Sequence, residues 1–192
     1  GLASALHKLA VIYRYQGKYD LALSIGDSAL SVLDPSKDKN IAAAVQSNQG
    51  VSYKYKGNYE KALKAFQASI GLHRELDHIS EVASVLNSIG VMYMSLEDYP
   101  KAIEYYNEAL EIQLVHNNKK EQANIYNNFA IIYANQGLLD SALTYFQKSY
   151  DMEYAMDNKK GMSETINNIG AVYYYMGDYD NAILQFEKSF SI

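Results

Sequence analysis

The sequence lacks cysteine and tryptophan altogether, and only 2 of its 192 residues are proline. Without cysteine, the chain has no disulfide, no thiolate ligand for zinc and no thiol nucleophile. Its apolar runs are all far shorter than the roughly 20 residues that cross a bilayer, so we expect no membrane association within this segment. The chain begins without Met and lacks the basic and apolar regions of a signal peptide. We therefore expect a segment of a longer protein, and the compartment stays open.

Positive charge is also scarce. The formal net charge is −5, which argues against a nucleic-acid partner. The charge is uneven, because residues 1–80 carry a net +3 and residues 81–192 a net −8. This asymmetry is either drift among solvated faces or the sign of a polarised molecule that orients a charged partner.

Sequence motifs of enzymes are missing too. There is no HExxH, GxSxG, Walker-type or dinucleotide-binding motif. His73 and His78 could suggest a metal site, but their spacing does not place both on one helical face, so we interpret them as surface residues. Glu104, Glu108 and Glu111 form a solvated face rather than an acid/base pair. We predict no catalytic residue, no metal and no cofactor, and hence no enzyme.

What the sequence does contain is a repeat. Tyrosine recurs every 40 residues without any insertion. A fixed period of this order indicates a solenoid or a similar array. The tyrosines that mark the period are Tyr13, Tyr53, Tyr93, Tyr133 and Tyr173. The chain therefore divides into five repeats of one domain, at 1–40, 41–80, 81–120, 121–160 and 161–192.

Each repeat is predicted to form two helices joined by a tight turn. In the third repeat, apolar residues run at helical spacing from Leu86 to Tyr93 and again from Ala102 to Leu110. The break between them carries glycine in the other four repeats, and glycine readily takes the left-handed conformation that ends a helix. These glycines are Gly17, Gly57, Gly137 and Gly177. The residues expected to cap the next helix are Asn58, Asp98 and Asp178.

Small residues recur at fixed places in both helices, where they would let two helix axes approach closely. In the first helix they are Ala10, Gly50, Gly90, Ala130 and Gly170. In the second helix they are Ala22, Ala62, Ala102, Ala142 and Ala182. The aromatics expected to fill the space beside this contact are Phe66, Tyr106, Phe146 and Phe186.

The junction of repeats one and two departs from this pattern. Gly26 stands where the other repeats carry an aromatic residue, and Gln46 and Gln49 stand where they carry apolar or aromatic ones. A polar loop, residues 34–40, joins the two repeats. Amides in a helix interface need partners or water, so the junction is either a hinge or binding notch or a locally satisfied variation.

The order of small residue, tyrosine, turn, alanine and aromatic resembles the tetratricopeptide repeat (TPR) along the whole chain. HEAT or armadillo arrays share a ~40-residue period but not this order. The resemblance implies an all-α fold, a right-handed solenoid of antiparallel helix pairs. Repeats of 40 residues, rather than the usual ~34, resemble those of kinesin light chains, LGN-type adaptors and bacterial multi-repeat sensor proteins.

A solenoid exposes a long concave surface that serves for binding, and in TPR proteins the first helices line it. The resemblance therefore implies a protein- or peptide-binding module. Asparagine is a poor residue for a helix interior, yet it recurs in this helix, where its amide could pair with the backbone of an extended peptide. Alternatively it bonds to the neighbouring repeat and fixes the stacking. These residues are Asn48, Asn87, Asn127, Asn128, Asn167 and Asn168.

Bases and aromatics gather on the same predicted groove. They are His7, Lys8, Arg14, Tyr15, Lys54 and Tyr55 in repeats one and two, and Tyr174 and Tyr175 in repeat five. Tyrosine supplies a large contact area with little loss of entropy. We therefore expect a protein or an extended peptide as partner, with acidic residues beside repeats one and two.

The sequence leaves two other roles open. The array could be a sensory or regulatory segment of a larger bacterial signalling protein, controlling a kinase, a cyclase or a transcription regulator, or it could be an oligomerisation module. We also expect Phe186, Phe190 and Ile192 to lie on an exposed apolar face that met a sixth repeat in the parent protein. Such a face would drive self-association.

Overall fold

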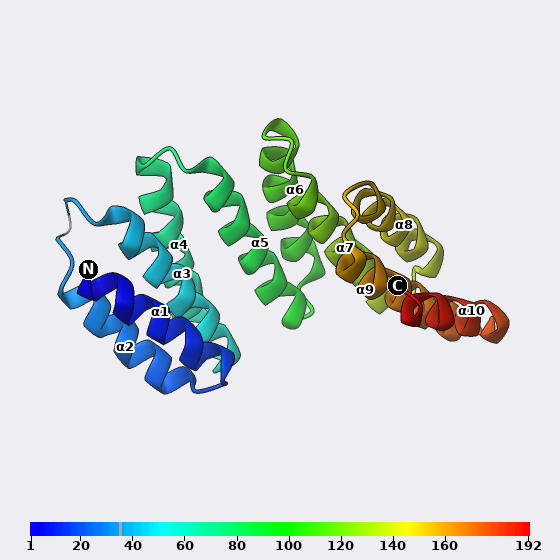
Figure 1. Ribbon diagram of the computed structural model, residues 1–192, viewed down its shortest axis with the longest axis horizontal. Coiled ribbons are helices and arrows are strands. Elements are labelled where there is room, and N and C mark those ends of the chain that lie inside the picture. The colour runs from blue at the N-terminus through cyan, green and yellow to red at the C-terminus, as the bar shows by residue number, and fades with distance from the viewer. Residues whose placement is uncertain (35) are drawn as a thin grey trace. The chain divides into compact units, whose positions relative to one another are not determined.

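The computed structural model describes residues 1–34 and 36–192, so Pro35 of the predicted inter-repeat loop lies outside the described residues. The described residues form ten α-helices and no strand (Figure 1). The predicted all-α fold is therefore confirmed. The chain divides into two compact parts, residues 1–109 and residues 110–192.

The first part holds the first five helices and the start of the sixth. They are α1 (Leu2–Tyr15), α2 (Tyr19–Ser31), α3 (Lys39–Tyr55), α4 (Tyr59–Glu75), α5 (Ile79–Ser95) and α6 (Tyr99–Val115). From α1 to α5 each helix packs against the next one along the chain, and α3 also contacts α1 and α5. The first helices of repeats one to three therefore form one side of this part (Figure 1).

The second part begins with the end of α6. It continues with α7 (Lys119–Asn135), α8 (Leu139–Ala155), α9 (Lys159–Met176) and α10 (Tyr179–Phe190). Here α7 packs on α8, α8 on α9 and α9 on α10. Each repeat contributes two helices, as predicted. No helix among the described residues combines the length and the apolar content that crossing a membrane requires.

The turns inside the repeats follow the predicted chemistry. Their glycines have φ between 72° and 79°, in the left-handed region, and are Gly17, Gly57, Gly137 and Gly177. The third repeat carries Glu97 at this place, with φ of 57°, a conformation that costs a residue with a Cβ atom about 1–2 kcal/mol. The next helix is capped as expected. The side chains of Asn58, Asp98 and Asp178 each accept a hydrogen bond from a backbone N–H three residues on, at 3.2–3.3 Å.

Inside a repeat, a small residue of the first helix meets an aromatic ring of the second. A Cβ atom on Gly90 would lie 2.4 Å from the ring of Tyr106, and one on Gly50 would lie 2.6 Å from the ring of Phe66. Both distances are far inside van der Waals contact, so only glycine permits this approach. Both rings are fully buried, which confirms the predicted pairing of small and aromatic residues.

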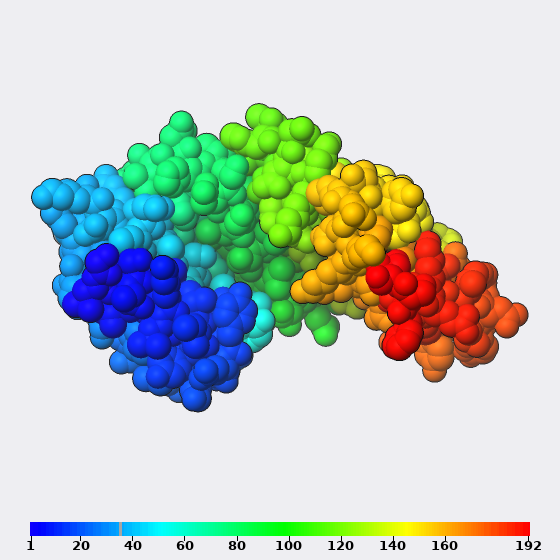
Figure 2. Space-filling model, in the orientation of Figure 1, coloured from blue at the N-terminus to red at the C-terminus, as the bar shows by residue number. Residues whose placement is uncertain are grey.

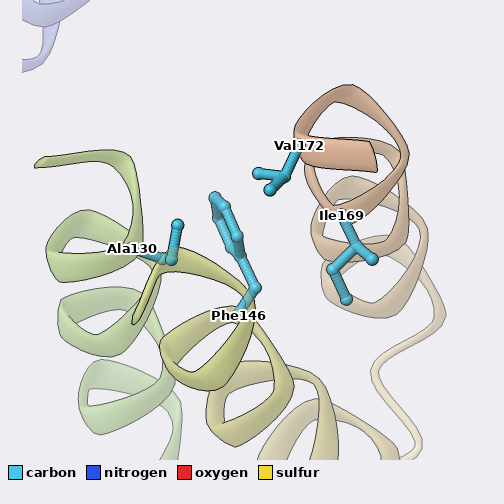
Figure 3. Packing of buried hydrophobic residues seen from close by; sticks show 5 residues of the cluster. Ala130, Phe146, Ile169 and Val172 are labelled. Atoms are coloured by element: carbon cyan, nitrogen blue, oxygen red, sulfur yellow. The ribbon is translucent and has the colours of Figure 1, made fainter. Parts of the chain in front are cut away.

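The fourth repeat shows how the same ring also joins successive repeats. Figure 3 shows the ring of Phe146 on α8 between Ala130 of α7 and Val172 of α9, with Ile169 of α9 beside it. All four side chains belong to one buried cluster. The aromatic residue therefore holds its own helix pair together and seats the first helix of the next repeat.

A recurring side-chain hydrogen bond supports each of two helix pairs. The hydroxyl of Ser69 on α4 donates to the backbone carbonyl of Ala43 on α3 at 2.8 Å. The hydroxyl of Ser149 on α8 donates to the carbonyl of Ala123 on α7 at 3.0 Å. Both serines are buried, so these bonds satisfy hydroxyl groups that have left water and fix the register of the two helices.

The junction of repeats one and two is satisfied locally at Gln49. Where Gly26 replaces an aromatic residue, the side chain of Gln49 fills the space, since a Cβ atom on Gly26 would lie 3.0–3.3 Å from three of its atoms. Gln49 is buried, and its Nε2 donates to Oδ1 of Asp27 at 2.7 Å. This supports the locally satisfied variation, because the amide already has a partner.

Replacing Gly90 by alanine should destabilise the protein, because the added methyl group overlaps the buried ring of Tyr106. Overpacking of this kind costs about 1–3 kcal/mol and opposes the roughly 1 kcal/mol that alanine gains over glycine in a helix. We expect overpacking to prevail, since the ring of Tyr106 is fully buried and its neighbours would have to shift with it. Urea unfolding measures the difference. G71A is the matched control: Gly71 lies in α4 with open space around it, so this variant should gain stability. A G90A variant stabilised to the same extent would contradict the close contact.

The last helix carries apolar side chains that no described residue covers fully. Phe186, Phe190 and Ile192 are all exposed, as predicted, and Phe190 is 97% exposed. At the position of α8 that matches Phe186, Phe146 is only 2% exposed because α9 packs on it. Figure 2 shows α10, in red, at the surface of the molecule. The face of α10 thus has the character of a helix interface.

We expect this face to cause self-association that grows with protein concentration. Replacing Ile183 and Phe190, both exposed on α10, by serine should remove it, because the association depends on burying apolar surface. Sedimentation velocity over a range of concentrations measures the effect. L138S changes an exposed leucine in the turn before α8 and should leave association as it is. A wild-type protein that stays monomeric at high concentration would show the prediction to be wrong.

Candidate ligand-binding face

The predicted groove residues lie on the first helix of each repeat. In each compact part, we call the side that these helices share the first-helix face of that part. It comprises α1, α3 and α5 in the first part, and α7 and α9 in the second. On α1, Nε of Arg14 donates to Oδ1 of Asn48 on α3 at 2.6 Å. Asn48 is only 7% exposed. Asn48 therefore binds Arg14 of the preceding repeat and links the two repeats. It is too deeply buried to face a ligand itself.

Basic side chains gather where α1 and α3 meet. Burial, followed by the nearby charge of Arg14, lowers the pKa of both His7 and Lys54. In the part of the chain that the structure describes, neither Arg14 nor Lys54 forms an ion pair with a carboxylate. Lys8 is exposed on α1. The first-helix face thus carries a positive cluster that is partly withdrawn from water and that a bound anion would compensate.

Two of these cations stack on neighbouring tyrosines. Cζ of Arg14 lies 4.3 Å from the ring centroid of Tyr15, and Nζ of Lys54 lies 4.4 Å from that of Tyr55. Both tyrosines are exposed, as predicted. Tyr55 also stacks on Tyr19 of α2, with ring centroids 5.2 Å apart. Tyr19 is not among the predicted site residues, because an aromatic residue at this turn recurs in other repeats and indicates packing.

The asparagines of the first-helix face take different environments. Nδ2 of Asn168 on α9 donates to Oδ1 of Asn127 on α7 at 3.2 Å. Like the bond between α1 and α3, it links the first helices of successive repeats, which is the stacking role. Asn167 is exposed, whereas Asn87 and Asn128 are half-buried. The exposed amide remains the one best placed to meet a ligand.

In repeat five the predicted tyrosines lie at the C-terminal end of α9. Tyr174 and Tyr175 are both exposed, with ring centroids 5.9 Å apart. Tyr174 also packs against Tyr179 of α10, at 5.7 Å between centroids. They form an aromatic surface beside the turn between α9 and α10.

A pocket of about 270 Å³ lies between α7, α8 and α9. Its lining includes Lys120, Asn124, Asn127, Ser149, Thr165 and Glu164. Glu153 of α8 also lines it, is only 3% exposed, and accepts a hydrogen bond from Nδ2 of Asn158 at 2.5 Å. Glu153 is not among the predicted site residues. The available signal was that a carboxylate stands where repeats one to three have Leu33, His73 and Gln113.

The interpretation of His73 as a surface residue is wrong. His73 is 6% exposed, and its Nδ1 has no hydrogen-bond partner among the described residues. It occupies the place of Glu153 in repeat two and lies close to Glu81 of α5. Burial lowers its pKa from the ordinary 6.5; Glu81 opposes the shift and His78 adds to it. No group of three or more histidine, cysteine or carboxylate side chains in residues 1–34 and 36–192 is placed to hold a metal ion.

Comparison with known families identifies the repeat. A family model described as the tetratricopeptide repeat matches residues 1–75, 81–154 and 121–192. The chain belongs to the tetratricopeptide-repeat family. This confirms the resemblance carried by the order of small residue, tyrosine, alanine and aromatic. None of the curated proteins matches the chain.

Solved TPR structures share the fold. The Rap conjugation gene regulator of plasmid pLS20, in complex with the Phr* peptide, has a TM-score of 0.80 and 22% identity, over 95% of this chain and 50% of that one. A putative kinesin light chain from Podosopora anserina has a TM-score of 0.73 and 13% identity, over 98% and 92%. A STAND signal-transduction ATPase with a TPR sensor, from Pyrococcus horikoshii, has a TM-score of 0.76 and 20% identity, over 90% and 27%. Identities this low establish a common fold alone.

Buried His73 should make the stability of the TPR array depend on pH. Its pKa is lowered in the folded state, so the unfolded chain binds the proton more tightly. The free energy of unfolding should therefore fall as the pH drops below the ordinary value of 6.5. The variant H73Q places a neutral amide at this position, as Gln113 does in repeat three. Part of the pH dependence of the free energy of unfolding should therefore disappear. Urea unfolding at about pH 7.5 and about pH 5.5 checks it. An identical pH dependence in both proteins would contradict the role of His73.

Proposed function

We propose that this TPR array is a non-catalytic binding module whose first-helix face holds an extended peptide or protein segment with acidic residues. The observation that carries the proposal is the cluster of Arg14 and Lys54 beside His7, in which neither cation has a carboxylate partner among the described residues. Exposed Tyr15 and Tyr55 lie beside it. Positive charge next to exposed aromatic surface suits an acidic segment with apolar neighbours.

The cluster is organised before a ligand arrives. Asn48 fixes the guanidinium group of Arg14, and Tyr15 stacks on it. Because burial and then the charge of Arg14 already lower the pKa of Lys54, an approaching carboxylate would relieve an existing repulsion. Each charge-assisted hydrogen bond formed there would contribute about 1.5–3 kcal/mol. Exposed Lys8 adds attraction at longer range.

An extended segment also needs partners for its backbone, and we propose the asparagines for this role. Asn167 is exposed and offers both a donor and an acceptor. Asn127 already accepts from Asn168, so its own amide N–H₂ group is the part it can offer. Tyr174 and Tyr175 supply aromatic surface on the same helix. Asn87 and Asn128 would act in the same way from α5 and α7.

The comparisons support binding on this fold without naming a ligand. The pLS20 Rap regulator was solved in complex with a peptide, which supports a peptide as ligand here. The Pyrococcus horikoshii protein carries its TPR array as a sensor, and a sensory role of this chain would use the same first-helix face. An oligomerisation role would instead use the apolar face of α10.

Peptides selected on this protein from a randomised display library should be enriched in Asp and Glu. K54E should weaken their binding by about tenfold or more at low salt, because one charge-assisted contact becomes a repulsion, and less at high salt. The double variant N127A/N167A should weaken binding with little loss of stability, since alanine is the better helix former. Fluorescence anisotropy measures affinity, and urea unfolding measures stability.

Two outcomes would count against the proposal. K64E makes the same charge change on the exposed side of α4 and should leave affinity unchanged; if it weakens binding as much as K54E, the effect is one of net charge. If N127A/N167A unfolds the array while affinity per folded molecule stays the same, Asn127 and Asn167 fix the stacking instead.

A further inference from the structure

The pocket between α7, α8 and α9 contains a buried carboxyl group with no cation beside it in the described structure. Its floor is Glu153, whose side chain is almost fully buried. The hydrogen-bond partner of Glu153 is the neutral amide of Asn158, at 2.5 Å. No lysine, arginine or histidine of the described chain forms an ion pair with it. A buried carboxylate without a cation is costly unless something else supplies the charge.

The backbone nearby is shaped around this carboxylate. A Cβ atom on Gly161, in the first turn of α9, would lie 2.4 Å from Cδ and 2.5 Å from Oε2 of Glu153. Glycine at this place therefore leaves the room in which the carboxylate lies. The backbone N–H of Gly161 also donates to Oδ1 of Asn158 at 3.3 Å, while the Nδ2 of Asn158 donates to Glu153. Asn158 and Gly161 thus hold the carboxylate in one position at the floor of the pocket.

The lysines of the pocket lining do not neutralise it. Lys160 is exposed and pairs with Glu164 at 3.6 Å, and Lys120 is exposed as well. Neither lies within ion-pair distance of Glu153 in the described structure. Exposed Lys120 and Lys160 thus lie at the mouth of the pocket, and the buried carboxylate of Glu153 lies at its floor.

We propose that this pocket takes a basic side chain, arginine or lysine, of a ligand that lies on the first-helix face. The cation would pair with Glu153, and the hydroxyl group of Thr165, which also lines the pocket, would accept one of its remaining N–H groups. A volume of about 270 Å³ accommodates a guanidinium group with its methylene stem. The inference rests on the proposed function, to which it adds a specificity-determining subsite.

The corresponding place between repeats two and three is built differently. His73, His78 and Glu81 stand where repeats four and five have Glu153, Asn158 and Gly161. Burial lowers the pKa of His73 and so favours its neutral form, which offers no charge to a basic side chain. The buried carboxyl group of Glu153 therefore has no counterpart at the position of His73. A subsite of this kind would fix the register of an extended ligand along the first-helix face of the second part.

Binding of N-acetyl-arginine methylamide, followed by amide chemical shifts in NMR, tests the subsite. The probe should move the signals of Gly161 and Thr165 in the wild-type protein. The citrulline derivative, which has the same shape without the charge, should bind at least about tenfold more weakly. E153Q, which keeps the size of the side chain, should weaken the arginine probe by a similar factor. E187Q makes the same charge change on exposed α10 and should bind it like the wild type.

Several results would overturn the subsite. They are equal binding of arginine and citrulline derivatives, unchanged binding in E153Q, or preferential binding of N-acetyl-glutamate methylamide through the mouth lysines. The comparison of the three probes on the wild-type protein decides the charge requirement even if E153Q does not fold. The probes have no extended backbone, so their failure concerns the pocket alone. Failure of the acidic peptides to respond to K54E concerns the proposed function instead.

Discussion

The contact between a small residue and an aromatic ring inside the helix pairs of repeats two to five is the constraint on which the rest of the structure depends. At Gly50 and Gly90 the ring lies where no Cβ atom could be placed, so the two helices of a repeat approach as closely as their backbones allow. Phe146 shows the second consequence, because its ring also packs on Val172 of the next repeat. Because the contact recurs every 40 residues, equivalent positions of the first helices face away from the second helix in successive repeats.

At some equivalent positions the side chain differs from repeat to repeat while the helix packing stays the same. These differences give single repeats polar or charged groups that could bind a ligand. One buried position on the second helix holds His73, Gln113 or Glu153 in repeats two to four. Gly26 shows how such a change is absorbed. The aromatic ring is missing there, and Gln49 of the next repeat occupies the space and finds its own hydrogen-bond partner. A repeat protein can thus exchange a core residue for a functional one as long as a neighbour fills the volume or satisfies the polar group.

The cluster of Arg14 and Lys54 and the pocket of Glu153 would attract opposite charges. Both sites depend on the partial burial of their side chains. Arg14 and Lys54 lie close enough for one to lower the pKa of the other, and Glu153 lies under a pocket without a cation. In water such charges would be screened and contribute little. The packing of neighbouring helices removes part of that water, so each site has a stronger preference for the opposite charge than an exposed residue would have.

The sequence by itself determined the family, the helix pairs, the turn glycines, the caps and the small–aromatic contact, because all of these depend on local spacing and recur every 40 residues. It also identified the basic residues and the exposed tyrosines of the first two repeats. Only the tertiary structure decided which polar residues are buried. It placed Asn48 beneath Arg14, joined Asn168 to Asn127, buried His73 and enclosed Glu153. The physical reason is that burial and pairing depend on side chains from two or three helices far apart in the sequence, and a helical repeat pattern specifies a residue's side of its own helix but not what a neighbouring repeat brings against it.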